Sequence, residues 1–209
     1  MKILLTGFDP FGGETINPSY EVLKLLPDSI SGHSLVKRQI PASYEESIKT
    51  MIALLEAERP DVVLSLGQAG GSFGLRVEKV GINLRDANSP DNDGHRASHE
   101  AIFNDGETAY FSSLPVKAMV KKLRENNIPA SVSYSAGSYV CNNVLYSLLY
   151  LQKKRYTNMR CGFIHVPYFP EQIMDKKNTV YMAPEEMKRG LETAIKAIIE
   201  NPADIDFIS

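Results

Sequence analysis

Tryptophan is absent from this chain of 209 residues, and cysteine occurs only twice, as Cys141 and Cys161. Two cysteines are too few for a disulfide-linked scaffold, so free thiols in a reducing compartment are expected. No segment approaches the roughly 18 consecutive apolar residues that a membrane-spanning helix needs. The short apolar run that follows Met1 and Lys2 also lacks the length and the cleavage site typical of a signal peptide. We therefore expect a cytoplasmic protein with no membrane partner.

An excess of charge of either sign is missing as well. The chain has 23 Lys and Arg residues against 25 Asp and Glu residues, with a formal net charge of −2. Nucleic-acid binding needs a clear basic excess or a basic stripe, so no nucleic-acid partner is expected. Hydrophobic residues make up 43% of the chain, which excludes global disorder and allows a sizeable core. The length suits one domain that spans residues 1–209.

Short apolar runs alternate along the chain with longer segments of helical periodicity. Strands are expected at residues 3–6, 35–40, 61–66, 130–134 and 161–166, and helices are expected from Asn17, Ser43, Pro115, Val140 and Pro184. This alternation predicts an α/β fold with an open, twisted, mostly parallel sheet and helices on both faces. Residues 75–84 suggest a strand or ribbon interrupted near Glu78. The polar stretch 85–107 is either a mobile lid or an ordered wall.

Four unusual segments directly follow predicted strands. They are Gly7–Gly13, Gly67–Gly71, Ser135–Asn142 and His165–Tyr168. In open α/β sheets, ligands bind beyond the carboxyl ends of the strands. We therefore expect these four segments to converge on one crevice.

Cys141 is the sharpest candidate for chemistry. It falls in the first turn of a predicted helix, where free backbone N–H groups and the positive dipole end favour a thiolate. A thiolate is a competent nucleophile, and the same N–H groups could stabilise an oxyanion. The alternative is a small buried core residue, which is the usual role of an intracellular cysteine. Cys161 lies within an apolar strand, and there the core role is favoured.

His165 and Glu78 are the candidates for partners of Cys141. His165 could serve as an acid/base group, or its ring could simply be satisfied by a backbone carbonyl at a strand end. A third group should hold the imidazole in one tautomer, and Glu78 could do so because it interrupts an apolar strand. From the residues alone, however, a solvent-facing charge on an edge strand is the favoured interpretation of Glu78.

Other clusters carry weaker signals. Five acidic and histidine residues gather in one polar stretch: Asp91, Asp93, His95, His99 and Glu100. They match no zinc motif, so no metal site is expected, nor any other cofactor. The glycines from Gly67 to Gly74 could bind an anion through backbone N–H groups, although no Walker-type lysine follows them. Phe8 and Phe11 lie in a tight glycine-rich loop and could wall an apolar pocket.

At these segments the chain resembles the pyroglutamyl peptidase I family, also called pyrrolidone carboxyl peptidases. The resemblance covers nearly the whole chain. It rests on the motifs TGFDPFGG from Thr6, GQAGG from Gly67, VEKVGINL from Val77, SYSAGSYVCN from Ser133 and HVPY from His165. The family consists of cytosolic cysteine peptidases on an open α/β sheet that remove N-terminal pyroglutamate from peptides.

The resemblance implies a role for each matching residue. Cys141 would be the nucleophile, His165 the general acid/base and Glu78 the third catalytic member. The substrate-binding residues implied are Phe8, Phe11, Asn17, Gln68, Tyr139 and Val140. Asn17 would help to hold the first loop, and the aromatic residues would wall the pocket for the lactam ring. Peptides with N-terminal pyroglutamate would be the partners, and a homo-oligomer, dimer or tetramer, is expected because the family often forms one.

Four positions depart from the family pattern. Asn88 and Ser89 stand where members often have Arg and Ile, Arg76 replaces a small hydroxyl residue, and Tyr139 replaces a common Phe. Because Cys141, His165 and Glu78 are all present, we expect activity through a thioester acyl-enzyme, with an altered affinity. Two alternatives stay open at this point: an α/β phosphorylase or nucleosidase that uses the glycine-rich loops for an anion, and a catalytically silent protein that binds pyroglutamyl peptides.

Overall fold

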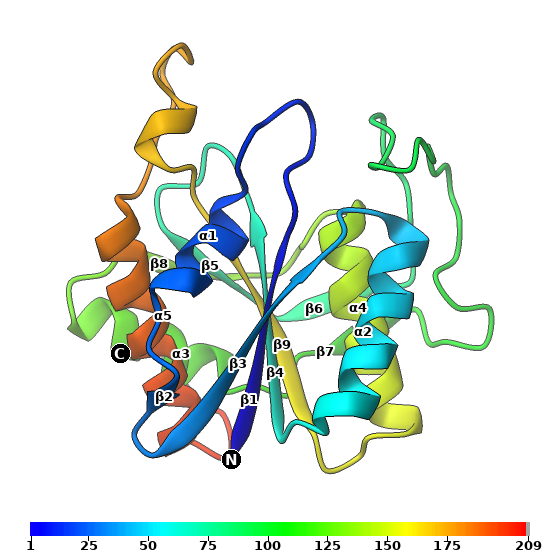
Figure 1. Ribbon diagram of the computed structural model, residues 1–209. Helices are drawn as coiled ribbons and strands as arrows, with labels where there is room; N and C mark the ends of the chain where they lie inside the picture. The colour runs from blue at the N-terminus through cyan, green and yellow to red at the C-terminus, as the bar shows by residue number, and fades with distance from the viewer. Residues whose placement is uncertain (208–209) are drawn as a thin grey trace.

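A computed structural model describes residues 1–207 of the chain. A twisted sheet of seven strands forms its centre (Figure 1). In spatial order the strands are β2 (Ser29–Ile30), β3 (His33–Ile40), β1 (Lys2–Phe8), β4 (Val62–Gln68), β9 (Arg160–Val166), β5 (Leu75–Glu78) and β8 (Ala130–Ser133). The pairs β3–β1, β1–β4 and β4–β9 are parallel. The predicted mostly parallel α/β sheet is therefore confirmed.

Two strands at one end of the sheet run against the central four. β5 pairs antiparallel with β9, and β8 pairs parallel with β5. Ser135–Asn142 follows β8 and therefore comes after a strand that runs opposite to the strands before the other three candidate segments. The reversal has a functional consequence, because it sets Arg76 opposite His165 and Glu78 opposite Phe163 in the antiparallel register.

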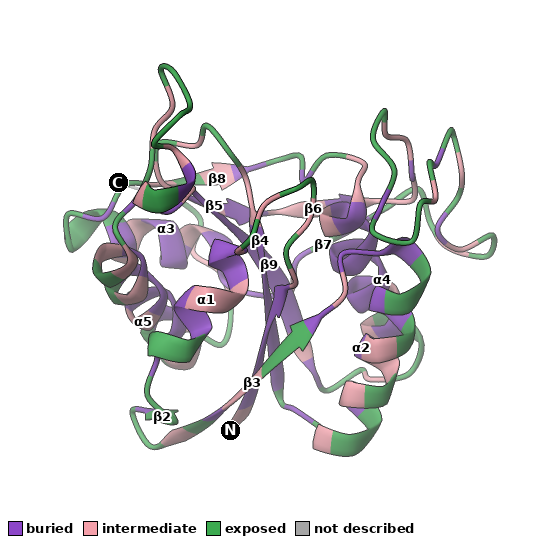
Figure 2. Cartoon of the chain, turned by 45° about the horizontal axis from the view of Figure 1, so that its top comes forward, coloured by how far each residue is buried: buried purple, intermediate pink, exposed green. Residues whose placement is uncertain are grey.

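Helices cover both faces of the sheet, as expected (Figures 1 and 2). One face carries α1 (Pro18–Leu25), α3 (Val116–Glu125) and α5 (Pro184–Glu200), and the other carries α2 (Tyr44–Glu58) and α4 (Val140–Lys154). Side chains of a strand alternate between faces, so Ile3 and Leu5 of β1 join the first core while Leu4 joins the second. Figure 2 shows this buried interior along the strands, whereas exposure concentrates on the loops and the outer helix surfaces.

The segment expected as one interrupted strand at residues 75–84 forms two short strands. β5 ends at Glu78, and β6 (Val80–Ile82) leaves the main sheet to pair with β7 (Ala109–Phe111). The break near Glu78 is thus a change of sheet. Three elements had no signal in the sequence analysis: β2, β7 and the 3₁₀ turn η1 (Pro170–Gln172).

The polar stretch 85–107 is tied to the body of the protein. The buried carboxylate of Asp91 accepts hydrogen bonds from the backbone N–H groups of Tyr44, Asp93 and His95. Asn92 donates to the carbonyl of Pro10 in the first loop. These contacts favour an ordered wall. Within residues 1–207, no helix is both long and apolar enough to cross a bilayer.

Candidate active site

Cys141 occupies the first turn of α4, as predicted from the sequence. No side chain caps this helix end, and its first turn has no acidic residue. The backbone N–H groups of the first turn of a helix have no intrahelical acceptor. The Cys141 sulfur therefore lies at an uncapped, electropositive helix end that can stabilise negative charge on the sulfur or on an oxygen beside it.

Two buried asparagines fix the position of this helix end. The side chain of Asn142 accepts from the N–H of Ile82 and donates to the carbonyls of Ile82 and Leu84. The side chain of Asn143 donates to the carbonyl of Tyr44 and accepts from Arg85. Sequence analysis included Asn142 only as the last residue of a motif and missed Asn143, although adjacent asparagines are poor helix formers and a helix that carries them signals a special role.

His165 lies near the end of β9, buried beside Cys141. Its Nδ1 atom is 2.7 Å from Oε1 of Glu78, which is fully buried on β5. Burial by itself would lower the pKa of His165, but the charge and hydrogen bond of Cys141 and those of Glu78 outweigh it and raise the pKa to about 9. An imidazolium at neutral pH is the partner that a thiolate needs.

The structure corrects the residue-based interpretation of Glu78 as a solvent-facing charge. β5 lies between β9 and β8, so Glu78 is on an interior strand with no solvent contact. Its Oε2 atom has no hydrogen-bond partner among the described residues. The Arg76 guanidinium lies 3.8 Å from the other carboxylate oxygen and donates to Oγ of Ser133 and to the carbonyl of Ser135. A buried carboxylate is thus paired with the imidazole and has a second cation nearby.

A glycine makes the close approach of β4 to Cys141 possible. A Cβ atom on Gly67 would lie 2.7 Å from the sulfur of Cys141 and 2.7 Å from the ring of Phe163. Any larger residue would push the thiol away from its present place. Gly67 therefore serves close packing here, which is a different use from anion binding.

A small apolar pocket adjoins the sulfur. Its lining residues are Phe8, Phe11, Ala42, Gln68, Tyr139, Val140 and Cys141. The rings of Phe11 and Tyr139 lie 6.2 Å apart, and the Tyr139 hydroxyl donates to the carbonyl of Pro90. None of these lining side chains is a permanent cation or a carboxylate. Such a pocket fits a small, uncharged, flat group that carries a few hydrogen-bonding atoms.

Asn17 does not line this pocket but holds the loop that does. Its Nδ2 atom donates to the carbonyl of Asp9, and its Oδ1 atom accepts from the N–H and the hydroxyl of Ser19. The loop between β1 and α1, which carries Phe11, is thereby closed at its base. Ala42 is a lining residue that sequence analysis missed, and a single alanine after a strand gives no signal that could have found it.

Other candidates lie apart from this centre. Cys161 is fully buried in β9, where burial raises its pKa to about 12, only partly opposed by Ser113. Asn88 and Ser89 are exposed in the 85–107 stretch. Within residues 1–207, no group of three or more His, Cys, Asp or Glu residues is placed to hold a metal ion. The cluster around Asp91 instead orders its own loop.

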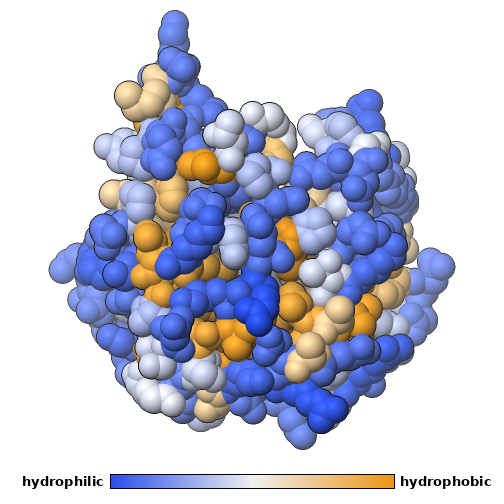
Figure 3. Space-filling model, in the orientation of Figure 1, coloured by the Kyte–Doolittle hydropathy of each residue, from blue (hydrophilic) through white to orange (hydrophobic). Residues whose placement is uncertain are grey.

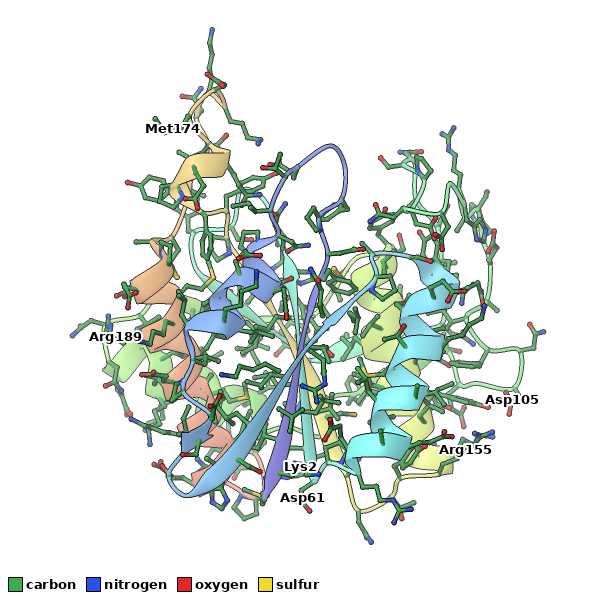
Figure 4. The ribbon with its side chains drawn as sticks, viewed as in Figure 1. Lys2, Asp61, Asp105, Arg155, Met174 and Arg189 are labelled. Atoms are coloured by element: carbon green, nitrogen blue, oxygen red, sulfur yellow. The ribbon has the colours of Figure 1, made fainter. Side chains whose placement is uncertain are left out.

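A larger hollow lies at the opposite end of the central strands, and neither Cys141 nor His165 is among its lining residues. It is lined by ten residues that include Arg59, Asp61 and Arg155. In Figure 4, Lys2, Asp61 and Arg155 lie at the end of the molecule away from the loops that form the site. Because Cys141 and His165 do not line this hollow, the smaller pocket is the candidate active site.

Comparison with known proteins agrees with this geometry. The family model described as pyroglutamyl peptidase matches residues 1–201. The pyrrolidone-carboxylate peptidase of Clostridium perfringens (strain 13 / Type A) is 52% identical over 205 residues, which cover 98% of this chain and 96% of the relative. The corresponding protein of Thermosipho africanus is 50% identical over 204 residues, covering 98% of this chain and all of the relative.

Solved structures give the same result. The crystal structure of pyroglutamyl peptidase I from Bacillus amyloliquefaciens matches with a TM-score of 0.95 at 38% identity, covering 99% of this chain and 98% of that one. The pyrrolidone carboxyl peptidase of Thermococcus litoralis matches with a TM-score of 0.92 at 38% identity, covering 95% and 93%. The resemblance seen in the motifs is confirmed, and the chain belongs to the pyroglutamyl peptidase family.

Proposed function

We propose that this chain is a cysteine peptidase that removes N-terminal pyroglutamate from peptides, with Cys141 as nucleophile, His165 as general acid/base and Glu78 as the group that orients the imidazole. The observation that carries the proposal is the buried chain of contacts from Glu78 through His165 to Cys141 at the uncapped start of α4. Membership of the family supports the same reaction and leaves the phosphorylase alternative without support.

Acylation begins when the Cys141 thiolate attacks the carbonyl that joins pyroglutamate to the next residue. The developing oxyanion is stabilised by N–H groups of the first turn of α4, at about 3 kcal/mol for each donor. The His165 imidazolium then gives its proton to the leaving nitrogen, and the shortened peptide departs with a free amine. A thioester between Cys141 and the pyroglutamyl group remains.

Deacylation uses the same groups in reverse. The neutral imidazole of His165 takes a proton from water, and the resulting hydroxide attacks the thioester carbonyl. Collapse of the tetrahedral intermediate releases pyroglutamate and restores the thiolate beside the imidazolium. The buried carboxylate of Glu78 accepts from Nδ1 throughout, so that Nε2 is the atom that exchanges the proton.

Specificity follows from what the pocket does not contain. Pyroglutamate has no free α-amine and carries no charge, so a site for it needs apolar walls and a few amide partners. Phe8, Phe11 and Tyr139 supply walls, with Val140 beside them, and Gln68 supplies an amide. A substrate with a charged N-terminus would lose its hydration without gaining a counter-ion, which rejects it strongly.

We further propose that the protein works in the cytoplasm as a homo-oligomer. Two free cysteines support a reducing compartment. Exposed side chains such as Phe73, Phe111 and Met174 support association, because large apolar groups on the surface mark contact regions. Light scattering of the purified protein at several concentrations measures the association state directly.

One assay tests the proposed function. The purified protein should hydrolyse a fluorogenic pyroglutamyl amide and should not hydrolyse the matched prolyl amide, whose ring amine is charged. Iodoacetamide should abolish the activity, and free pyroglutamate or its amide should slow that inactivation. Binding of a pyroglutamyl peptide without turnover would instead identify a silent binder, and phosphate-dependent cleavage of nucleosides would identify a phosphorylase.

A further inference from the structure

The segment that connects β9 to α5 reaches the candidate active site, although most of it lies outside the motifs of the sequence analysis. It contains η1 and projects beyond the same end of the strands as the other site loops (Figure 1). Figure 4 shows Met174 on this projection, and the space-filling view in Figure 3 shows its outer end to be mainly hydrophilic. Gln172, at the end of η1, is nevertheless buried, with 8% of its surface exposed. A buried amide must have its donors and acceptor satisfied.

The hydrogen bonds of Gln172 fix which way its amide faces. Its Oε1 atom accepts from the backbone N–H of Phe169 at 3.1 Å, and an N–H can only donate. On the other side, its Nε2 atom lies 3.3 Å from a carboxylate oxygen of Glu14, which can only accept. Both neighbours therefore impose the same orientation, with the Nε2 group of Gln172 turned toward Glu14 and Gln68.

The orientation of the Gln172 amide also determines the orientation of the Gln68 amide. The Nε2 group of Gln172 donates to Oε1 of Gln68 at 2.9 Å. The oxygen of Gln68 is thus engaged outside the pocket, and the end of its amide that remains for the pocket is a donor. Gln68 lines the pocket beside Phe8 and Cys141. The ring carbonyl of a lactam is an acceptor and needs a donor of this kind.

We propose that Gln172 is a positioning residue that sets the hydrogen-bonding polarity of the specificity pocket. Its amide is anchored by the N–H of Phe169 and holds Gln68 with its NH₂ group toward the substrate, where that group donates to the ring carbonyl of pyroglutamate. The inference rests on the proposed function, since it names the substrate atom that Gln68 recognises. Without Gln172, the amide of Gln68 can rotate and present its oxygen, which repels the ring carbonyl.

A purely structural role would also explain why Gln172 is buried. Lys176 donates to Glu14 and to the carbonyl of Gln172, so the projection is joined to the first loop by several contacts. The two roles differ in what they need. A structural role needs an amide and a carboxylate paired at positions 172 and 14, whereas a positioning role needs a donor aimed at Gln68.

Exchanging the amide and the carboxylate between positions 172 and 14 distinguishes the structural role from the positioning role. In Gln172→Glu, one carboxylate oxygen still accepts from Phe169, but the other can only accept and forces Gln68 to turn its NH₂ group outward. The double variant Glu14→Gln/Gln172→Glu restores the amide–carboxylate pair and the net charge while it keeps the reversed polarity. Glu14→Gln alone is the matched control. Steady-state kinetics with a pyroglutamyl amide should be measured for all four proteins.

We expect KM to rise by about tenfold or more in Gln172→Glu and equally in the double variant, with kcat changed by less than about threefold, because a buried hydrogen bond is lost from the ground state and the transition state alike. Glu14→Gln should keep KM within about twofold of the wild type. Recovery of the wild-type KM in the double variant, or an unchanged KM in Gln172→Glu, would overturn the inference. A wild-type protein that does not cleave the substrate would overturn the proposed function itself.

A substrate analogue gives a second measurement that does not depend on how well the charged variants fold. In this analogue the carbonyl oxygen of the lactam ring is replaced by sulfur, which is a weaker hydrogen-bond acceptor. For the wild type we expect kcat/KM to fall about tenfold with this analogue, and for Gln172→Leu we expect the penalty to shrink to less than about threefold. Equal penalties in both proteins would show that Gln172 does not direct a donor to that atom.

Discussion

The two cysteines of this protein lie in regions that differ in solvent exposure and in the charges near the sulfur. Cys141 is partly exposed at the uncapped start of α4, beside an imidazole whose pKa is raised to about 9. Cys161 is fully buried near the start of β9, where burial raises its own pKa to about 12. Its thiol makes a weak contact with Oε1 of Gln152 at 3.5 Å, and a hydrogen bond with Ser113 opposes the burial effect only in part.

The difference predicts that the reactivity of each thiol depends on the surroundings of its sulfur. A thiolate in the interior of β9 would lose its hydration with no cation to replace it, so that thiol stays neutral and inert. At Cys141 the helix end and the imidazolium replace the lost water. Each prediction below changes one part of those surroundings, or one of the two thiols.

The largest effect should separate the two thiols themselves. Cys141→Ala should lower turnover of a pyroglutamyl amide by at least about 10⁴-fold, because the nucleophile is gone. Cys161→Ala should keep turnover within about twofold and cost about 1 kcal/mol of unfolding free energy for the small cavity it leaves. Kinetics and urea titrations of both variants check the contrast.

Alkylation tests the same contrast on the unmodified protein. Iodoacetamide should label Cys141 first, in step with loss of activity, while Cys161 reacts only after unfolding. Peptide mapping by mass spectrometry assigns the label. Similar loss of turnover in both alanine variants would contradict the assignment of the nucleophile.

A smaller effect is expected from changing Glu78, whose carboxylate faces the imidazole. Glu78→Gln keeps the shape of the buried side chain but removes the charge and the obligate acceptor that faces Nδ1 of His165 at 2.7 Å. The ring can then adopt the wrong tautomer, so kcat should fall roughly 10²- to 10⁴-fold. Circular dichroism should show the fold intact, and an unchanged kcat would remove Glu78 from the mechanism.

The raised pKa of His165 predicts how activity and stability depend on pH. Above about pH 9 the ring loses its proton, so acylation should slow and kcat/KM should fall. Because the folded pKa lies above the ordinary value of 6.5, the protonated ring stabilises the folded state. That contribution is fully present below pH 6.5 and is lost as pH rises to about 9.

Cys141→Ala provides the control for this pH dependence. Removing the Cys141 side chain removes the largest influence that raises the pKa of His165, so that pKa should fall and the loss of stability should move to lower pH. Nuclear magnetic resonance of the ring protons measures the pKa, and urea unfolding between pH 6 and pH 9 measures the stability. An identical titration in both proteins would show that the two groups are not coupled.

Much of this arrangement could be predicted from the sequence because it is local. The position of Cys141 after a strand and at the start of a helix follows from neighbouring residues, as does the capping role of Asn17. The sheet with helices on both faces follows from the alternation of apolar periods. These features depend on contacts within a few residues, which is the range over which sequence patterns carry physical information.

The parts that could not be predicted depend on distant pairings. Glu78 looked like an exposed charge because nothing local shows that β5 runs between β9 and β8 in the opposite direction. Gln172 touches Gln68 across 104 residues of sequence, and η1 gave no periodic signal. The motif resemblance supplied the role of Glu78, but only the three-dimensional arrangement shows its burial and the second cation beside it.

The second cation, Arg76, should have the smallest effect on activity among the groups near Cys141. Arg76 lies 3.8 Å from the carboxylate of Glu78, and its side chain is 38% exposed, so solvent weakens its influence. Arg76→Ser removes a positive charge near His165, which should raise the pKa of the imidazolium slightly and shift the alkaline limb of kcat/KM upward. We expect kcat to change by less than about fivefold, and Arg76→Lys should restore the pH profile because it restores the charge. A profile that is the same in all three proteins would show that the charge on Arg76 does not reach the catalytic centre, and that its bonds to Ser133 and Ser135 serve only to close the loop after β8.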